Sequence, residues 1–154
     1  MRWNQGRDAI ERMLAASELQ RVPASREHAD QLIRQARRHL ASADEIRQDD
    51  PAGGYTLVYD AARKALTAVL ENQGLRPTTR GGHLAVYQAI RVQLDPPMGQ
   101  MLRPFDRMRR QRHDAEYPAA GSPQVGADDV REDAAKAAAI VDLAERVLDQ
   151  MSPF

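Results

Sequence analysis

The stretch YTLVYDAARKALTAVLENQ, residues 55–73, decides the fold of this chain. Its apolar side chains recur every three or four positions, which is the spacing of one face of a helix. The resulting stripe is too wide for a single neighbouring helix to cover, so we expect residues 55–73 to form the most buried helix. The stripe consists of Leu57, Val58, Ala61, Ala62, Ala65, Leu66, Val69 and Leu70.

Helical spacing continues on both sides of this stretch. We expect further helices over residues 4–20, 25–47, 83–94, 104–117 and 128–151, and we expect no strand, because no segment alternates apolar and polar residues. Long helices with short connections predict an all-α fold, an antiparallel four- to five-helix bundle with an extra N-terminal helix. A chain of 154 residues has about the length of one domain, so we expect a single helical domain over residues 1–154.

Particular residues mark where these helices should begin and end. Asn4 and Ser25 are suitable N-caps for the first two helices. Gly53 and Gly54 indicate a turn before the central helix, and Gly74 is in position to end that helix in a left-handed conformation.

The composition excludes several classes of site. The chain has no cysteine and only four scattered histidines, so neither a disulfide framework nor a zinc site is expected. We expect no metal and no cofactor. No apolar stretch approaches the roughly 20 residues of a membrane span, and the N-terminal residues carry no apolar signal segment. We therefore expect a cytoplasmic protein without a membrane partner.

The charges are unevenly distributed, although the formal net charge is zero. Residues 51–113 carry ten basic and four acidic side chains, whereas residues 114–154 carry three basic and nine acidic ones. Such a split either docks an acidic last helix on a basic helix or leaves a basic surface for phosphate groups.

The most informative segment is RPFDRMRRQRHDAEY, residues 103–117. It concentrates arginines beside a histidine and a tyrosine, whereas a solvated helix usually mixes charge signs. Arg109, Arg112 and His113 share one side of the expected helix, and a planar guanidinium group suits phosphate oxygens. A histidine exchanges protons near neutral pH, so this set can bind an RNA phosphodiester and cleave it without a metal, with the 2′-hydroxyl as nucleophile. A solvated face with weak surface ion pairs is the alternative.

Several segments carry patterns of a known family: residues 29–43, YDAARKAL at 59–66, residues 73–77 and 81–83, and RRQRHDAEY at 109–117. With these segments, which span most of its length, the chain resembles HEPN-domain proteins, and in particular the free-standing actinobacterial type. The resemblance implies a helical bundle that forms a homodimer, in which the signature helices of two protomers line a basic cleft. It also implies RNA or nucleotide binding, and metal-independent RNA endonuclease activity in toxin–antitoxin, anti-phage or CRISPR systems.

The family signature is an arginine, a polar residue directly after it, and a histidine after four to six intervening residues. Arg107 and His113 fit this spacing, but Met108 takes the place of the polar residue. In the other frame Arg112 is the signature arginine, His113 is the polar residue, and Tyr117 stands where the catalytic histidine belongs. We favour this Arg-His-x-x-x-Tyr variant, because it is similar to a form found in non-nuclease or poorly characterised branches of the family. A tyrosine hydroxyl stays protonated near pH 7 and cannot serve there as a general base.

The resemblance assigns roles to five residues of this segment. Arg112, His113 and Tyr117 are the candidate catalytic residues: Arg112 contacts the phosphate, and the other two position or polarise it. Arg107 and Arg109 are candidate phosphate-binding residues that add positive charge.

Three further residues are candidates for supporting roles. Asp60 lies within the apolar central helix and must be paired if it is buried, with Arg109 or Arg112 as the expected partner. His83 follows two glycines at a helix start, where it either caps the helix or reaches the arginine cleft. Asp114 belongs to the signature segment itself.

The sequence therefore predicts a HEPN-type protein that binds RNA or nucleotides, with metal-independent endoribonuclease activity as its candidate chemistry. The alternative is a non-catalytic helical interaction protein that partners a minimal nucleotidyltransferase, which would act as the antitoxin. In a third interpretation the arginines only dock the acidic last helix, through carboxylates such as Asp128 or Glu145.

Overall fold

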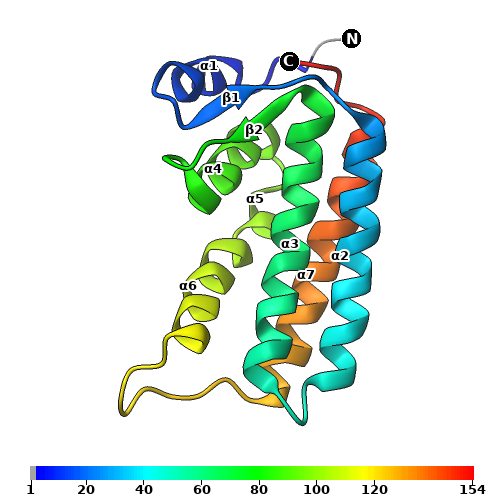
Figure 1. The fold of residues 1–154 in the computed structure, drawn as a ribbon. Helices are drawn as coiled ribbons and strands as arrows, with labels where there is room; N and C mark the ends of the chain where they lie inside the picture. Colours follow the sequence, from blue (N-terminus) through cyan, green and yellow to red (C-terminus); the bar gives the residue numbers. More distant parts are fainter. Residues whose placement is uncertain (1–2) are drawn as a thin grey trace.

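The computed structural model describes residues 3–154 and confirms the all-α fold (Figure 1). No helix in this part of the chain is long and apolar enough to cross a membrane. The helices are α1 (Arg7–Ala15), α2 (Arg26–Ile46), α3 (Pro51–Gln73), α4 (Gly82–Leu94), α5 (Gly99–Leu102), α6 (Pro104–Glu116) and α7 (Ala127–Leu148), and the strands are β1 (Leu19–Arg21) and β2 (Leu75–Pro77).

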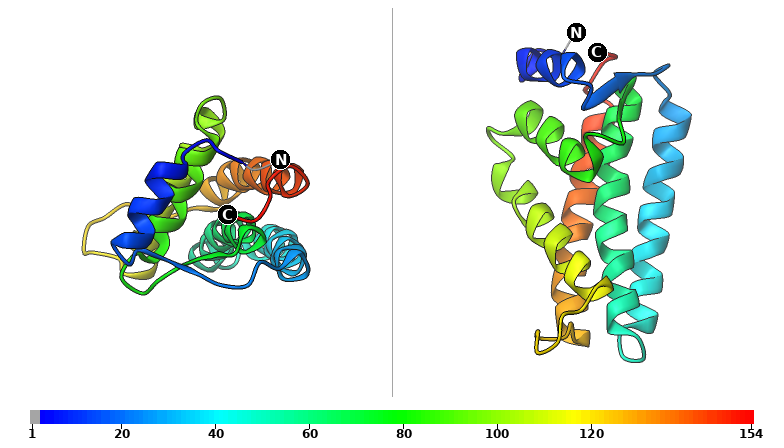
Figure 2. Two further views of the ribbon diagram at one scale, coloured as in Figure 1. Left: turned by 90° about the horizontal axis from the view of Figure 1, so that it is seen from above. Right: turned by 60° about the vertical axis from the view of Figure 1, so that its left-hand side comes forward.

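Three long helices, α2, α3 and α7, lie side by side, with α2 running opposite to the other two (Figure 1). Helices α4, α5 and α6 follow one another along another side of α3, and α1 lies across the end of the bundle that holds both termini (Figure 2). Helix α3 contacts α2, α4, α6 and α7. The central position predicted for residues 55–73 is confirmed, since Tyr55, Tyr59, Leu66 and Leu70 are all fully buried.

The central helix begins four residues earlier than predicted, at Pro51. Asp50 is its N-cap, and its carboxylate accepts a hydrogen bond from the backbone N–H of Gly53 at 2.9 Å. Pro51 suits the first turn, where its missing N–H is not needed. The turn predicted at Gly53 and Gly54 is therefore wrong, because both lie inside the helix. A side chain at Gly54 would bring Cβ within 3.3 Å of Val130 Cγ1, so this glycine serves close helix packing.

A short antiparallel sheet replaces the end of the predicted first helix. Helix α1 ends at Ala15, and β1 pairs with β2 so that Leu19 lies opposite Pro77. The prediction that the chain forms no strand is therefore wrong. Strands of three residues are too short for an alternating apolar and polar pattern to be recognised in the sequence. The first helix also begins differently, since Gly6 rather than Asn4 is its N-cap.

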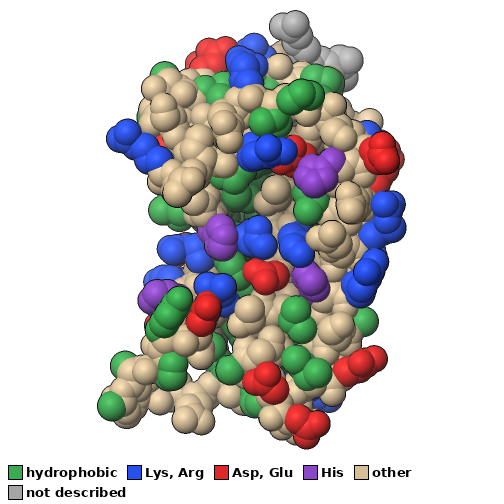
Figure 3. All heavy atoms as spheres, viewed as in Figure 1, with side chains coloured by type: hydrophobic (Ala, Val, Ile, Leu, Met, Phe, Trp, Pro, Cys, Tyr) green, Lys and Arg blue, Asp and Glu red, His purple; other side chains and the backbone are tan. Residues whose placement is uncertain are grey.

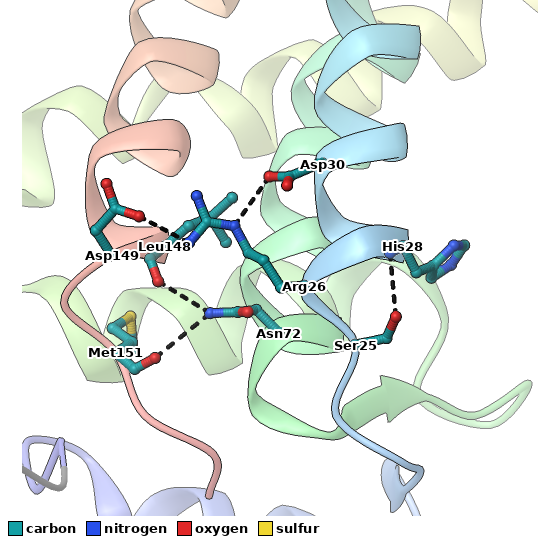
Figure 4. Close-up of polar contacts among 8 residues, drawn as sticks. All are labelled: Ser25, Arg26, His28, Asp30, Asn72, Leu148, Asp149 and Met151. Atoms are coloured by element: carbon teal, nitrogen blue, oxygen red, sulfur yellow. Dashed lines mark hydrogen bonds and ion pairs between the residues drawn. The ribbon is translucent and has the colours of Figure 1, made fainter.

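Two predicted helix ends are confirmed. Ser25 is the N-cap of α2, and its Oγ accepts a hydrogen bond from the N–H of His28 at 3.1 Å (Figure 4). Gly74 ends α3 with a φ of 81°, and its N–H donates to the carbonyl of Glu71 at 3.1 Å. A Cβ at Gly74 would lie 2.8 Å from the carbonyl oxygen of Val22, so both the backbone conformation and the close approach require glycine.

Polar contacts fix the C-terminal end of α7 to α2 and α3 (Figure 4). The guanidinium group of Arg26 donates to Asp149 at 2.7 Å. Asn72 Nδ2 donates to the carbonyls of Leu148 at 3.1 Å and Met151 at 3.4 Å. These contacts hold the three long helices together at this end, and α4 and α6 lie against α3.

Candidate functional site

A pocket of about 630 Å³ opens between α3, the start of α4, and α6. Figure 3 shows basic and histidine side chains gathered around a hollow on this face of the molecule. Tyr59 of α3 lines the pocket, together with five of the residues that the sequence singles out. These five are His83, Arg109, Arg112, His113 and Asp114.

Arg112 lies between α6 and α3. Its side chain is 26% exposed, and its Nη1 lies 2.7 Å from Oε2 of Glu116, one turn along the helix. Its guanidinium carbon lies 5.9 Å from the centroid of the Tyr59 ring, within the range of a cation–π contact. Its Nε is buried and has no hydrogen-bond partner among the described residues. Because buried donors are nearly always paired, the protein alone does not satisfy this guanidinium group.

Arg109 and Arg110 share a single carboxylate. Arg109 Nε and Nη2 donate to Oδ1 of Asp106 at 3.0 and 2.9 Å, and Arg110 Nε lies 3.5 Å from Oδ2 of the same residue. Two positive charges therefore face one negative charge, and both arginines line the pocket. This part of the pocket keeps an excess of positive charge.

His83 enters the pocket from the start of α4 and contacts Tyr59. The Tyr59 hydroxyl lies 2.8 Å from Nδ1 of His83. Burial raises the pKa of Tyr59, so its phenol keeps its proton. Burial, together with the charges of Arg63 and Arg112, lowers the pKa of His83, so the imidazole is neutral near pH 7. The buried hydroxyl donates to Nδ1, and the proton of the neutral ring then resides on Nε2.

His113 and Tyr117 meet at the C-terminal end of α6. Their ring centroids lie 5.1 Å apart, and His113 lines the pocket. Tyr117 is 64% exposed and is not among the residues that line the pocket. It therefore reaches the pocket only through His113.

Arg107 lies away from this pocket. Its guanidinium group donates to both oxygens of Asp133 on α7, at 2.6 and 3.0 Å, and the Tyr55 hydroxyl donates to the same carboxylate at 2.6 Å. Burial by itself would raise the pKa of Asp133, but the hydrogen bonds from Arg107 and Tyr55 outweigh it and hold the pKa below its ordinary value. Arg107 thus docks α6 on the acidic last helix, through a different carboxylate from those named above.

The partner predicted for Asp60 is wrong. Its Oδ1 lies 3.5 Å from Nε of Arg63, three positions later on α3, rather than beside Arg109 or Arg112. Side chains three positions apart on a helix are neighbours, so the local partner is reached first. Tyr59 lines the pocket and is a site residue that the sequence reasoning missed, whereas Arg63, four positions later on α3, lies near the pocket without lining it. The spacing of four positions, which places both residues on one side of a helix, was the available signal.

The pocket combines groups that recognise phosphate oxygens. Guanidinium groups from α6 and the neutral imidazole of His83 face one volume, and charge-assisted hydrogen bonds from arginine are the strong contacts to phosphate. In the described part of the chain, no three His, Asp or Glu side chains gather so as to hold a metal ion.

Comparisons with known proteins give one match. The family model described as "HEPN domain" matches residues 29–151, which is well over half of the chain and includes every residue that lines the pocket. No curated protein and no solved structure matches the chain.

Proposed function

Because the chain belongs to the HEPN domain family, we propose that it binds phosphate groups of RNA or nucleotides in the pocket between α3, α4 and α6. Membership of this family supports a nucleotide- or RNA-related function in general. The site residues proposed for this chain are Arg112 and Arg109 for the phosphate, with His83 and His113 as further hydrogen-bonding groups. Asp114 lines the pocket beside them.

One observation carries this proposal. Arg112 is held against Tyr59 with a buried Nε that lacks a partner, in a pocket where two other arginines share one carboxylate. An anion that enters the pocket would find positive charge that is already desolvated and oriented, which strengthens electrostatic binding.

Metal-independent RNA cleavage is the second candidate function, and the two pocket histidines favour it. His83 and His113 come from different helices and line the same pocket as Arg112. In such a cleavage the 2′-oxygen forms a bond to phosphorus and the bond to the 5′-oxygen breaks. His113 takes the proton of the 2′-hydroxyl, and water supplies a proton to the leaving 5′-oxygen. An arginine and the Nε2–H of His83 donate hydrogen bonds that stabilise the charged transition state.

The interaction-protein alternative is favoured by a different observation. Tyr117 is the most exposed large hydrophobic side chain in the described part of the chain, at 64%, and follows the signature arginine and histidine. An exposed tyrosine there is accessible to a partner such as a minimal nucleotidyltransferase. Under either function we propose a homodimer, whose mass in solution is measured by light scattering.

The test is RNA binding and cleavage without metal. A fluorescently labelled short RNA is titrated with the protein in EDTA, and the same samples are run on a gel to detect cleavage. We expect Arg112→Ala to weaken binding about tenfold or more, since charged hydrogen bonds to phosphate are worth roughly 1.5–3 kcal/mol. Arg131→Ala is the matched control, because this exposed arginine pairs with Asp128 on α7.

The outcomes separate the candidates. Cleavage that is lost in Arg112→Ala and in His113→Ala supports the endonuclease, whereas binding without cleavage supports a binding protein. Equal affinities of wild type and Arg112→Ala would remove the pocket from the proposal, and the absence of any RNA or nucleotide binding would leave the interaction-protein alternative.

A further inference from the structure

A line of basic and polar side chains leaves the pocket and crosses the exposed sides of α3 and α2. We call this line the basic strip and define it as Arg63 and Lys64 of α3 with His39 and Arg38 of α2. Lys64 Nζ lies 2.7 Å from Nε2 of His39, which joins the two helices. In Figure 3 the basic and histidine side chains of this face form a band across the middle of the molecule.

Arg63 connects the basic strip to the pocket. Burial lowers the pKa of His83 in the pocket, and the charges of Arg63 and Arg112 act in the same direction. Burial also lowers the pKa of His39, and there the charges of Lys64, Arg63 and Arg38 add to the effect. Arg63 therefore lies close enough to influence both histidines, and so does Asp60, whose charge acts in the opposite direction at each of them. Arg63 thus connects the pocket with the basic strip.

Most of the charge on the basic strip is uncompensated. Lys64 donates to Gln35 Oε1 at 3.1 Å and to His39, and neither is an acid. Because an ammonium group has only donors, His39 must accept at Nε2 in its neutral form. Arg38 is exposed and forms no ion pair within the described chain. The neighbouring Arg37, in contrast, pairs with Asp142 and Glu145 of α7.

Arg63 itself is only partly satisfied. Its Nε lies 3.5 Å from Oδ1 of Asp60, which is a weak contact, and this buried Nε has no hydrogen-bond partner among the described residues. It shares this property with Arg112, whose guanidinium group lies over the Tyr59 ring. The guanidinium groups of Arg112 and Arg63, both incompletely paired, thus lie where the pocket meets the basic strip.

The exposed apolar side chains lie beside the pocket rather than on the basic strip. Leu84, which lines the pocket, is 39% exposed, and Tyr117, whose ring lies tilted against that of the pocket residue His113, is 64% exposed. Proteins that bind single strands combine a positive groove along the backbone with apolar or aromatic faces on which unpaired bases stack. A duplex offers no free base faces for such contacts.

We propose that the pocket and the basic strip form one track for single-stranded RNA, with a phosphate and its base at the pocket and the following phosphates along Arg63, Lys64 and Arg38. This inference rests on the proposed function, since it extends the same pocket. It assigns an extended strand rather than a mononucleotide as the ligand. It also gives α2 and α3 a role outside the signature segment.

The experiment compares ligand length. A labelled dinucleotide and a labelled decanucleotide of the same single-stranded RNA are titrated with the full chain in EDTA at several salt concentrations. The test variant is the double substitution Lys64→Gln with Arg38→Gln. The control, Arg131→Gln with Arg146→Gln, removes two exposed positive charges from α7. Circular dichroism during thermal unfolding checks that both variants fold.

We expect the wild type to bind the decanucleotide at least tenfold more tightly than the dinucleotide. The test variant should lose most of this difference, keep its dinucleotide affinity, and show a salt dependence smaller by about one unit of slope for each lost phosphate contact. The α7 control should behave as the wild type.

Two results would overturn the track. One is equal affinity for the two lengths while dinucleotide binding stays sensitive to Arg112→Ala, which leaves the proposed pocket intact and removes the strip. The other is displacement of the decanucleotide by an acidic peptide at equal concentration, which would identify the strip as a protein-binding surface. If the wild type binds neither RNA, this result would count against both the proposed function and the track.

Discussion

The hydroxyl of Tyr59 lies 2.8 Å from Nδ1 of His83, and this hydrogen bond joins the fully buried centre of α3 to the wall of the pocket. The phenol is fully buried, and the His83 ring is the one hydrogen-bond partner of its hydroxyl among the described residues, so its proton is directed at the imidazole. Nδ1 is thereby committed as an acceptor, and the proton of the neutral ring is on Nε2. The buried tyrosine thus decides which face of His83 a ligand meets.

Replacing Tyr59 with phenylalanine should remove the preference of His83 for the tautomer with its proton on Nε2. We expect the ¹⁵N shifts of His83 to change from a single Nε2–H form to a mixture, because the donor to Nδ1 is removed. The loss of one buried hydrogen bond should lower the free energy of unfolding by about 1 kcal/mol. RNA affinity should fall a few-fold at pH 7. Histidine ¹⁵N NMR and a binding titration measure these effects.

The control for this substitution is Tyr87→Phe. Tyr87 belongs to the same aromatic cluster and stacks on Phe105 with centroids 5.6 Å apart, but the Nδ1 of His83 is hydrogen-bonded to Tyr59 and not to Tyr87. An unchanged His83 spectrum in Tyr59→Phe, or an equal change in Tyr87→Phe, would contradict the tautomer assignment.

His39 and His83, whose surroundings disfavour the charged imidazole, should make the fold less stable in mild acid. Burial is the first cause that lowers the pKa of both His39 and His83 below the ordinary value of 6.5. The unfolded chain then takes up protons at higher pH than the folded protein does. The stability that their neutral forms contribute is therefore complete above pH 6.5 and is lost as the pH falls through the lower, folded-state pKa values.

Urea unfolding at a series of pH values checks this dependence. We expect the unfolding midpoint to fall as the pH is lowered from about 7.5 to about 5, and we expect His83→Gln to flatten part of the slope. His28→Gln is the comparison variant, because His28 lies in the first turn of α2 and does not line the pocket. A steeper slope in His83→Gln than in wild type would show that His83 is not the group involved.

Local signals in the sequence predicted the helix ends correctly where one residue type decides them. Ser25 caps α2 through its own hydroxyl, and Gly74 adopts a left-handed conformation that other residues avoid. The glycine pair at 53–54 led to the wrong prediction of a turn. Gly54 instead makes room for Val130 of α7, a residue far away in the sequence. A packing contact between segments far apart in the chain leaves no periodic trace.

The candidate site was predictable only in part for a similar reason. Arg112 and His113 follow from the composition of one segment, and both line the pocket. Arg107 comes from the same segment but faces Asp133, because a helix sends neighbouring side chains to different sides. Tyr59 lines the pocket only because α3 packs against α6, which is a tertiary contact.

Asp133→Asn should destabilise the fold by about 2 kcal/mol, since it leaves Arg107 and the buried Tyr55 hydroxyl without their charged partner. The carboxylate is 5% exposed and accepts from both groups. Urea denaturation at pH 7 measures the change. Because the folded-state pKa of Asp133 lies below its ordinary value, the carboxylate contributes stability above the unfolded pKa, and this is lost as the pH falls through the folded one. The difference between variant and wild type should therefore shrink in strong acid.

Asp128→Asn is the matched control for that substitution. Its side chain is 80% exposed and pairs with Arg131 at 3.5 Å, so we expect a change within about 0.5 kcal/mol. Equal effects of the two substitutions would mean that the Arg107–Asp133 pair does not hold α6 on α7.

Gly74 and Gly121 offer a direct separation of backbone strain from steric contact. Both have a φ of 81°, but a Cβ at Gly74 would lie 2.8 Å from the Val22 carbonyl oxygen, whereas nothing lies within 4 Å of one at Gly121. Gly121→Ala should therefore cost about 1 kcal/mol, the penalty of the left-handed conformation alone. Gly74→Ala must also displace backbone next to β1 and β2, so we expect a cost at least twice as large in urea unfolding. Equal costs would show that the backbone around Val22 moves without a free-energy penalty. The hydrogen bond from the Val22 N–H to the Gly74 carbonyl would then not hold the short sheet against α3.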